Sequence, residues 1–432
     1  MGNVRRRVSL TLITFLVNVF TVCTLPAQNL VITNARIIDG TDRVINRGSV
    51  VVRDGRIASV SENTARPAGA SVIDAKGMTV MPGFIDSHRH VIQGDPAQWL
   101  KELAATRMQE YLDAGFTTIF SLGDPLEQII ELRHRLSSGE IKGPRLMAVG
   151  RVPLARAAGV GRGGVDPARI DVSRPPYRPT TAATGIPREE TLETVRMLAK
   201  AGVEAFKMAI TVTPGGPEKQ TLALITAEAK KIGIPTITHA VSVEDTLAAV
   251  EAGTTILAHT PHIGQLDPAQ TSKIASAGIP MMSTLGVFVP TFAENNTRAR
   301  ARTGDDNVAR FRDLDPFPWE TLSSAGQGPV NARLLWEAGI TYGYGTDTTF
   351  LPKDSLAHEL RPLSLVFSRK DIIRIMTRNA AAAIGRTKDL GTLAPGKLGD
   401  LVILDGNPLA DISDVLKVKV VVKEGKIVVD KR

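Results

Sequence analysis

The middle of the chain repeats one pattern of hydrophobic and polar positions. Six times, a segment with helical character ends at a glycine, and a short apolar run follows at once. Glycine suits this position because the residue after a helix often adopts a left-handed conformation, which costs more for a residue with a Cβ atom. The six apolar runs are 116–122, 203–210, 234–240, 254–260, 279–285 and 340–347. The pattern therefore predicts six helix–strand units joined by short loops.

Two more predicted strands complete a set of eight. One ends at Phe84-Ile85-Asp86, and the other covers 145–149. Short loops between helices and strands imply parallel strands with right-handed crossovers. Eight such units predict an α/β fold, a (β/α)8 TIM barrel. An open doubly wound sheet is the alternative, but no glycine-rich dinucleotide fingerprint follows the first strand, and we favour the barrel.

The two ends of the chain carry a different pattern. Residues 30–80 and 400–429 alternate short apolar runs with turn signals, such as Asp54-Gly55, Asp405-Gly406 and Glu424-Gly425. Asp-Gly and Glu-Gly between apolar runs are typical of β-hairpins. Neither end alone can bury a core, so we expect one small β-sandwich assembled from both ends.

The beginning of the chain is typical of an export signal. Arg5-Arg6-Arg7 precedes an apolar stretch over 8–25, and Ala27 offers a small residue for cleavage. We expect a periplasmic or secreted protein with no stable membrane span after cleavage. An uncleaved anchor is the alternative, because the apolar stretch is slightly long. The predicted domains are a signal peptide (1–27), the sandwich (28–81 and 386–432) and the barrel (82–385).

Composition narrows the possible functions. The 432 residues are 43% hydrophobic and 22% charged, which excludes a disordered chain, a coiled coil and a multi-span membrane protein. The formal net charge is +8, but the sequence contains no basic run interleaved with aromatic residues. We therefore do not expect nucleic acid as a partner. Cys23 is the only cysteine, which excludes a disulfide framework and a thiolate metal cluster. A metal site must therefore use His, carboxylate or modified Lys side chains.

Ionisable side chains end five of the eight predicted strands. In such a barrel the active site lies where the carboxyl ends of the strands meet. The first strand carries His88 and His90, which are two residues apart and share a face, whereas Arg89 between them should face away. The other four of these strands carry Lys207, His239, His259 and Asp347.

Each of these residues alone has an ordinary structural explanation. A strand-end His is often simply hydrogen-bonded, Lys207 can extend to solvent, and Asp347 can cap the next helix. Burying all six around one axis without a cation would be costly. Imidazole and carboxylate ligands suit Zn²⁺ or a similar divalent ion. Because one catalytic ion needs only about three protein ligands, six candidates indicate two ions.

Two segments resemble the amidohydrolase superfamily. Its first-strand signature is similar to residues 82–90, Pro-Gly-Phe-Ile-Asp-Ser-His-Arg-His. Its return into the sandwich is similar to residues 390–402, Leu-Gly-Thr-Leu-Ala-Pro-Gly-Lys-Leu-Gly-Asp-Leu-Val. The spacing between the two segments also fits, and the resemblance is strongest to the imidazolonepropionase-like and Xaa-Pro dipeptidase-like branch. It implies a metal-dependent hydrolase that cleaves an amide-like C–N bond.

The resemblance also implies a role for each residue at the strand ends. It gives two ligand sets: His88, His90 and Asp347 for the more buried ion, and His239 and His259 for the more exposed ion. Lys207 would be carbamylated by CO₂, which turns a cation into an anion that bridges the two ions. A metal-bound hydroxide would attack the substrate, and Asp347 would pass its proton to the leaving nitrogen.

Three further residues are weaker candidates for contact with the substrate. His262 lies in the loop after the sixth strand, and His358 lies at the start of the last predicted helix. Arg151 begins a long loop, where it could clamp a substrate carboxylate together with Arg156 and Arg162. Solvated arginines without such a role are the alternative.

Three functions remain open. The first is a binuclear hydrolase of dipeptides or N-acyl amino acids. The second is a mononuclear enzyme of the same fold that hydrolyses a cyclic amide or deaminates a ring; Lys207 weighs against it, because a single ion needs no bridging carbamate. The third is a catalytically silent binding protein, which the presence of all six candidate ligands disfavours. We expect the first, with a small-molecule substrate; a homo-oligomer stays open.

Overall fold

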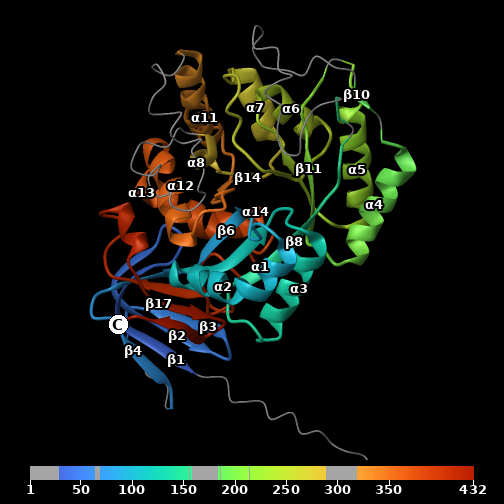
Figure 1. Ribbon diagram of the computed structural model, residues 1–432. Helices are drawn as coiled ribbons and strands as arrows, with labels where there is room; N and C mark the ends of the chain where they lie inside the picture. The colour runs from blue at the N-terminus through green and yellow to red at the C-terminus, as the bar shows by residue number, and fades with distance from the viewer. Residues whose placement is uncertain are drawn as a thin grey trace, which may run out of the picture.

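The computed structural model describes residues 29–63, 69–154, 156–157, 183–184, 186–213, 215–288 and 319–432. The predicted export signal, Arg162 and the side chain of Arg156 lie outside the described residues. Two units are visible in Figure 1: a barrel surrounded by helices, and below it a sheet in which blue strands from the start of the chain lie beside red strands from its end.

Eight parallel strands form the barrel and follow one another in chain order. They are β6 (Phe84–Arg89), β7 (Phe116–Ser121), β8 (Arg145–Arg151), β11 (Ala205–Ala209), β12 (Thr236–His239), β13 (Ile256–Leu257), β14 (Met281–Met282) and β15 (Tyr342–Gly343). The ring closes between β15 and β6, because the amide of Ser87 donates to the carbonyl of Tyr344 at 2.8 Å. The amide of Asp347 likewise donates to the carbonyl of His88 at 2.7 Å. The predicted (β/α)8 barrel is confirmed.

Helices cover the outside of the barrel (Figure 1). They are α1 (Pro96–Glu102), α2 (Ala104–Asp113), α3 (Leu126–Ser137), α4 (Arg188–Lys200), α5 (Glu218–Ile232), α6 (Val243–Glu251), α7 (Pro268–Ser276), α8 (Leu285–Phe288), α11 (Trp319–Glu337), α12 (Pro352–Val366), α13 (Arg369–Arg374) and α14 (Ala380–Ala383), with a π-helical turn, η3 (Ile375–Asn379). The six glycines expected to end helices all have a positive φ, from 65° at Gly278 to 95° at Gly339. The left-handed helix ends predicted from the sequence are therefore present.

Several barrel strands are shorter than their apolar runs. β13 covers only Ile256–Leu257, although the predicted strand spans 254–260. Pairing continues for one residue, because the amide of Ala258 donates to the carbonyl of Thr238 at 2.9 Å. The chain then leaves the ladder and turns into the loop at the mouth of the barrel. The sequence pattern thus predicts where a strand lies, whereas the number of its residues that pair depends on the course of the neighbouring strand.

The sheet outside the barrel is built from both ends of the chain. Its strands are β1 (Leu30–Ile38), β2 (Val44–Arg53), β3 (Arg56–Ser61), β4 (Ser71–Asp74), β5 (Thr79–Pro82), β16 (Leu401–Leu404), β17 (Val418–Lys423) and β18 (Lys426–Asp430). Their order is β18-β17-β16-β5-β1-β2-β3, with β4 beside β1. β16 pairs antiparallel with β5, so this pair joins the C-terminal strands to the N-terminal ones. The expected assembly of a strand-rich unit from both ends is confirmed.

The two units share a buried surface. Val402 and Val421 of the end sheet belong to the same apolar cluster as Phe84 and Phe116 of the barrel. A second cluster, with Leu30 among its members, lies within the end sheet itself. The barrel is therefore packed onto the end sheet rather than tethered to it. Among the described residues, no helix has the length and apolar character needed to cross a membrane.

Candidate active site

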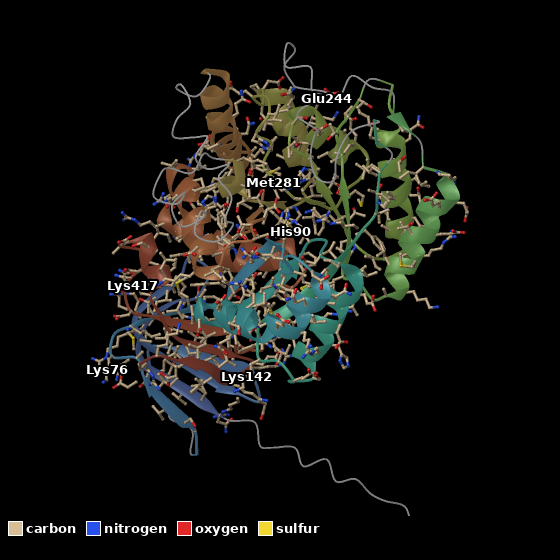
Figure 2. The ribbon with its side chains drawn as sticks, in the orientation of Figure 1. Lys76, His90, Lys142, Glu244, Met281 and Lys417 are labelled. Atoms are coloured by element: carbon tan, nitrogen blue, oxygen red, sulfur yellow. The ribbon has the colours of Figure 1, made fainter. Side chains whose placement is uncertain are left out.

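The six predicted strand-end residues lie together at the mouth of the barrel. His90, labelled in Figure 2, lies near the middle of the ring of helices, just after β6. Asp347 Oδ1 is 3.2 Å from His88 Nε2 and 3.0 Å from His90 Nε2. Asp347 Oδ2 is 3.8 Å from His259 Nε2.

The remaining two candidates extend the same cluster. Lys207 Nζ is 2.8 Å from His88 Nε2. The rings of His239 and His259 have their centroids 4.3 Å apart. Residues from β6, β11, β12 and the segments after β13 and β15 thus meet in one place, which is the convergence that the strand pattern predicts.

Backbone geometry fixes Asp347 in this position. Its φ is 46°, in the left-handed region, where Asp is among the better tolerated residues. Asp86 holds the preceding residue, because the Thr346 hydroxyl donates to its carboxylate at 2.7 Å and the Thr346 amide at 3.2 Å. The amide of His88 donates to the same carboxylate at 3.1 Å. Asp86 therefore ties the first strand to the segment that carries Asp347.

Arg89 faces away from the barrel axis, as strand alternation predicts. Its guanidinium is buried and donates to the Tyr111 hydroxyl at 2.6 Å. It also donates to the hydroxyls of Thr346 at 3.0 Å and Thr348 at 2.9 Å. Arg89 is thus a structural residue that holds the loop around Asp347.

Burial keeps three imidazoles of the cluster neutral, those of His88, His239 and His259. It lowers the pKa of His88 to about 4 and that of His239 to about 3, and it lowers the pKa of His259 well below its usual value. Nearby Lys207 lowers all three further, whereas Asp347 acts in the opposite direction. A neutral imidazole has a free lone pair, which is the form that binds a metal ion.

The lone pairs of two of these imidazoles face the cluster. His88 Nδ1 lies 3.0 Å from the carbonyl oxygen of Ala258, which can only accept, so Nδ1 carries the proton and Nε2 the lone pair. His259 Nδ1 lies 2.9 Å from the Thr284 hydroxyl, and His259 Nε2 is buried without a hydrogen-bond partner. A buried nitrogen of this kind calls for a ligand.

The charged members of the cluster have shifted pKa values as well. Burial acts to raise the pKa of Asp347, but His88 and His90 outweigh it and hold that pKa well below the usual range. Burial lowers the pKa of Lys207 to about 8; Asp347 opposes this shift, whereas Arg151 adds to it. At neutral pH the cluster therefore holds a carboxylate and an amine that is partly neutral.

The cluster has the composition of a divalent metal site. His88, His90 and Asp347 each offer one ligand atom, and these atoms all lie within 4.8 Å of one another. Imidazole nitrogen and carboxylate oxygen are the ligands that Zn²⁺ and similar ions prefer. Together with the unpartnered Nε2 of His259, they fit a bound ion.

The three weaker candidates surround this cluster in different ways. The ring of His262 stacks on Phe288, with centroids 3.5 Å apart. His358 contacts α8, because its Nε2 lies 2.7 Å from the carbonyl oxygen of Gly286. Contrary to the sequence prediction, it lies inside α12, which begins at Pro352 and is followed by further helices.

Arg151 lies at the end of β8. It is exposed and in register with Lys207 of the neighbouring strand. Its side chain passes over Gly123, where an added Cβ would lie 2.1 Å from Arg151 Nε. Gly123 therefore makes the room that this side chain needs at the mouth.

Sequence reasoning missed two buried carboxylates near the site. Asp124 accepts from the amides of Val91 at 2.9 Å and Ile92 at 3.1 Å, which fixes the chain just after His90. The signal for it was available, because it lies only three residues after the end of β7. Glu359 of α12 accepts from the amides that begin α8, and burial raises its pKa to about 8. No local signal marks it, since its partners are more than 70 residues away.

A profile of the amidohydrolase family matches residues 79–428. This chain belongs to the amidohydrolase family. It is 26% identical over 405 residues to an imidazolonepropionase from Porphyromonas gingivalis, covering 85% of this chain and 84% of that protein. Among solved structures, it is similar to a protein assigned as a prolidase from Bifidobacterium longum, with 25% identity, a TM-score of 0.72, and coverage of 94% of this chain and 97% of that one. The fold of a Xaa-Pro dipeptidase with bound methionine is also similar, with 22% identity, a TM-score of 0.72, and coverage of 93% and 99%.

Membership of this family identifies the chain as an enzyme, a hydrolase that acts on C–N bonds. Amidohydrolases are typically metal-dependent, and the group of His88, His90 and Asp347 could hold an ion. The resemblance found in the sequence is thereby confirmed at the level of the family and the fold.

Proposed function

We propose that this amidohydrolase uses two divalent ions to cleave the amide bond of a dipeptide or an N-acyl amino acid. One observation carries the proposal: six ionisable side chains from five strands meet at one mouth, and their spacing leaves ligand atoms facing one another. Six such groups exceed the needs of one ion, which commonly takes about three protein ligands in a catalytic site.

The ligand set would be divided between the two ions. His88, His90 and Asp347 would hold one, His239 and His259 the other, and carbamylated Lys207 would bridge them. When bound, ions of this kind, Zn²⁺ in our proposal, supply a Lewis acid that lowers the pKa of water and polarises a carbonyl group.

Two features of Lys207 support its carbamylation. Burial lowers the pKa of its amine to about 8, which favours the neutral form that combines with CO₂. The Arg151 guanidinium also lowers that pKa, which means that it repels an ammonium at Lys207. A carbamate there would be negative, and the same guanidinium would attract it.

Asp347 is the proposed proton carrier. Its carboxylate lies among three imidazoles, which hold it in the ionised form that can accept a proton from the attacking water. As the C–N bond breaks, the same oxygen donates that proton to the leaving nitrogen, so that one residue serves first as base and then as acid.

Arg151 supports a substrate with a free carboxylate. Arg151 is an exposed residue at the end of β8, in register with Lys207, and a guanidinium binds a carboxylate through two parallel hydrogen bonds. Dipeptides and N-acyl amino acids carry this carboxylate close to the scissile nitrogen. The solved structures named as prolidase and Xaa-Pro dipeptidase fit the same substrate class.

We place the enzyme in the periplasm or outside the cell. The support is the basic start, the apolar stretch and the small residue at Ala27, which together are typical of a cleaved export signal.

A mononuclear hydrolase of a cyclic amide is the second candidate. The close group of His88, His90 and Asp347 is sufficient for one ion. The chain is also similar over most of its length to proteins named imidazolonepropionase.

A hydrolysis screen separates the two candidates. The chain loaded with Zn²⁺ is incubated with dipeptides, N-acyl amino acids, their C-terminally amidated forms and a set of cyclic amides. We expect release of amino acids from the first two groups, at least about tenfold slower release from the amidated forms, and loss of release on chelation. Turnover of cyclic amides alone would establish the second candidate instead.

A further inference from the structure

A pair of stacked rings forms one wall beside the proposed metal ligands. Phe288, at the end of α8, has its ring centroid 5.4 Å from that of His259 and 3.5 Å from that of His262. The rings of Phe288 and His262 are nearly parallel, at 17°. Burial lowers the pKa of His262 to about 4, so the stacked pair is uncharged at neutral pH. Phe288 is only half-buried, which leaves part of this apolar surface accessible.

Helix α12 determines where this wall stands. Both polar backbone groups of Gly286 are bound by neighbouring residues of α12: His358 Nε2 donates to its carbonyl at 2.7 Å, and its amide donates to Glu359 at 2.6 Å. The amide of Leu285 also donates to Glu359, at 3.0 Å. A helix as short as α8 does not hold its own shape in water. The position of Phe288 therefore depends on His358 and Glu359.

The close fit leaves no space for a side chain at Gly286. A Cβ atom added there would lie 2.9 Å from both Glu359 Oε2 and His358 Cδ2. The two α12 residues thus contact the backbone of α8 directly, with no side chain between them, so their position fixes the position of α8.

Strand order places this wall across the mouth from Arg151. β14, which precedes α8, is the seventh strand of the barrel, and β8, which ends at Arg151, is the third. In a closed ring of eight strands, the third and the seventh are opposite. A substrate whose carboxylate binds Arg151 therefore extends its other end toward Phe288. In an N-acyl amino acid, that other end is the acyl group, beyond the scissile carbonyl.

We propose that Phe288, backed by His262, binds the acyl group of the substrate and selects flat, apolar acyl groups over small ones, and that His358 and Glu359 are positioning residues for this wall. The inference rests on the proposed function, because that function sets which end of the substrate faces Arg151. Removing the ring takes away apolar contact with a large acyl group but leaves a small one almost unaffected.

The test compares N-benzoylglycine with N-acetylglycine on the metal-loaded chain. Both kcat/KM and the dissociation constant from calorimetry are measured, so that binding is assessed even without turnover. We expect the wild type to favour the benzoyl compound at least about tenfold, and Phe288→Ala to reduce this ratio to about one, with the acetyl compound changed by less than about twofold. Phe288→Leu, which keeps an apolar side chain at this position, should lose most of the preference as well.

Variants of α12 test the positioning role. His358→Gln keeps a donor near the place of Nε2 and should retain the benzoyl preference, whereas His358→Leu should lose most of it. Leu365→Ala, at an exposed position of the same helix, is the matched control and should behave as wild type. A benzoyl preference that survives Phe288→Ala, or a wild type that binds both compounds equally or neither, would overturn the inference. If binding shows a preference that depends on Phe288 but neither compound is hydrolysed, the proposed function is refuted, whereas the role of Phe288 in binding the acyl group is retained.

Discussion

At both Lys207 and Asp347, burial shifts the pKa in one direction and the charge of a neighbouring residue shifts it in the other. Burial prevails at Lys207 and charge prevails at Asp347, which gives each residue its proposed role. Burial of the Lys207 amine favours its neutral form, which is reactive toward CO₂. Burial of Asp347 would favour protonation, but the imidazoles around it keep the carboxylate ionised. The sequence predicted that these side chains meet, because strand alternation and the carboxyl ends of parallel strands are geometric rules. It did not predict Glu359, because contacts between distant segments leave no local pattern.

Lys207→Ala should lose most bound metal and most hydrolytic activity, because it removes the proposed bridging anion. Short carboxylic acids such as acetate should restore part of both, since they supply two oxygens to the space left by the side chain. Metal content and turnover are measured with and without the acid. Lys142→Ala is the control, at an exposed lysine on the outer surface (Figure 2). Full activity of Lys207→Ala without added acid would refute the bridging role.

Asp347→Asn should keep part of the metal but lower kcat by roughly 10²-fold or more, because an amide cannot carry a proton from water to the leaving nitrogen. The measurement is kcat with metal content determined on the same sample, so that loss of metal is separated from loss of proton transfer. Turnover like that of the wild type would assign the proton transfer to another group.

The local sequence predicts which strands the barrel contains better than it predicts how long each strand is. Each predicted strand after a helix-ending glycine is present, but β13, β14 and β15 are only two residues long. An apolar run reports burial, and it carries no information on where the neighbouring strand bends away. His259 lies two residues beyond the end of β13, so this early departure from the ladder is what brings it into the mouth.

The glycines at the helix ends allow a test of how backbone strain and packing stabilise these elements. Gly115 has a φ of 93°, and an added Cβ would lie 2.8 Å from the ring of Phe84. Gly115→Ala should therefore lower the free energy of unfolding by roughly 2–4 kcal/mol, from backbone strain and overpacking together. Gly278→Ala is the matched control, because its φ is 65° and its Cβ would meet nothing within 4 Å; it should cost about 1–2 kcal/mol. Equal losses in denaturant titrations would contradict the packing argument.

The whole molecule depends on contacts between its two units. Arg145 of β8 pairs with Asp400 at 2.8 Å and with Glu424 at 2.5 Å, so one barrel side chain binds two positions in the C-terminal part of the end sheet. Hairpin signals at both chain ends predicted that this sheet would form. They did not predict the ion pairs, because nothing in the sequence near Arg145 indicates a partner more than 250 residues away.

Arg145→Met should lower the free energy of unfolding by roughly 3 kcal/mol, because it leaves the buried carboxylate of Asp400 without its cation. Arg333→Met, which breaks an exposed pair with Glu337, is the control and should change stability by less than about 1 kcal/mol. Denaturation midpoints of the two variants give the comparison. Similar midpoints would mean that the contact between the units adds little stability.

The number of metal ions bound per chain tests the central claim most directly. Purified protein, kept with bicarbonate and without chelators, is measured by elemental mass spectrometry against its concentration from amino-acid analysis. The account predicts about two equivalents of divalent transition metal for each chain. One equivalent of metal per chain would refute the bridged pair of ions and support a mononuclear site. A chain that is free of metal yet fully active would contradict the account altogether.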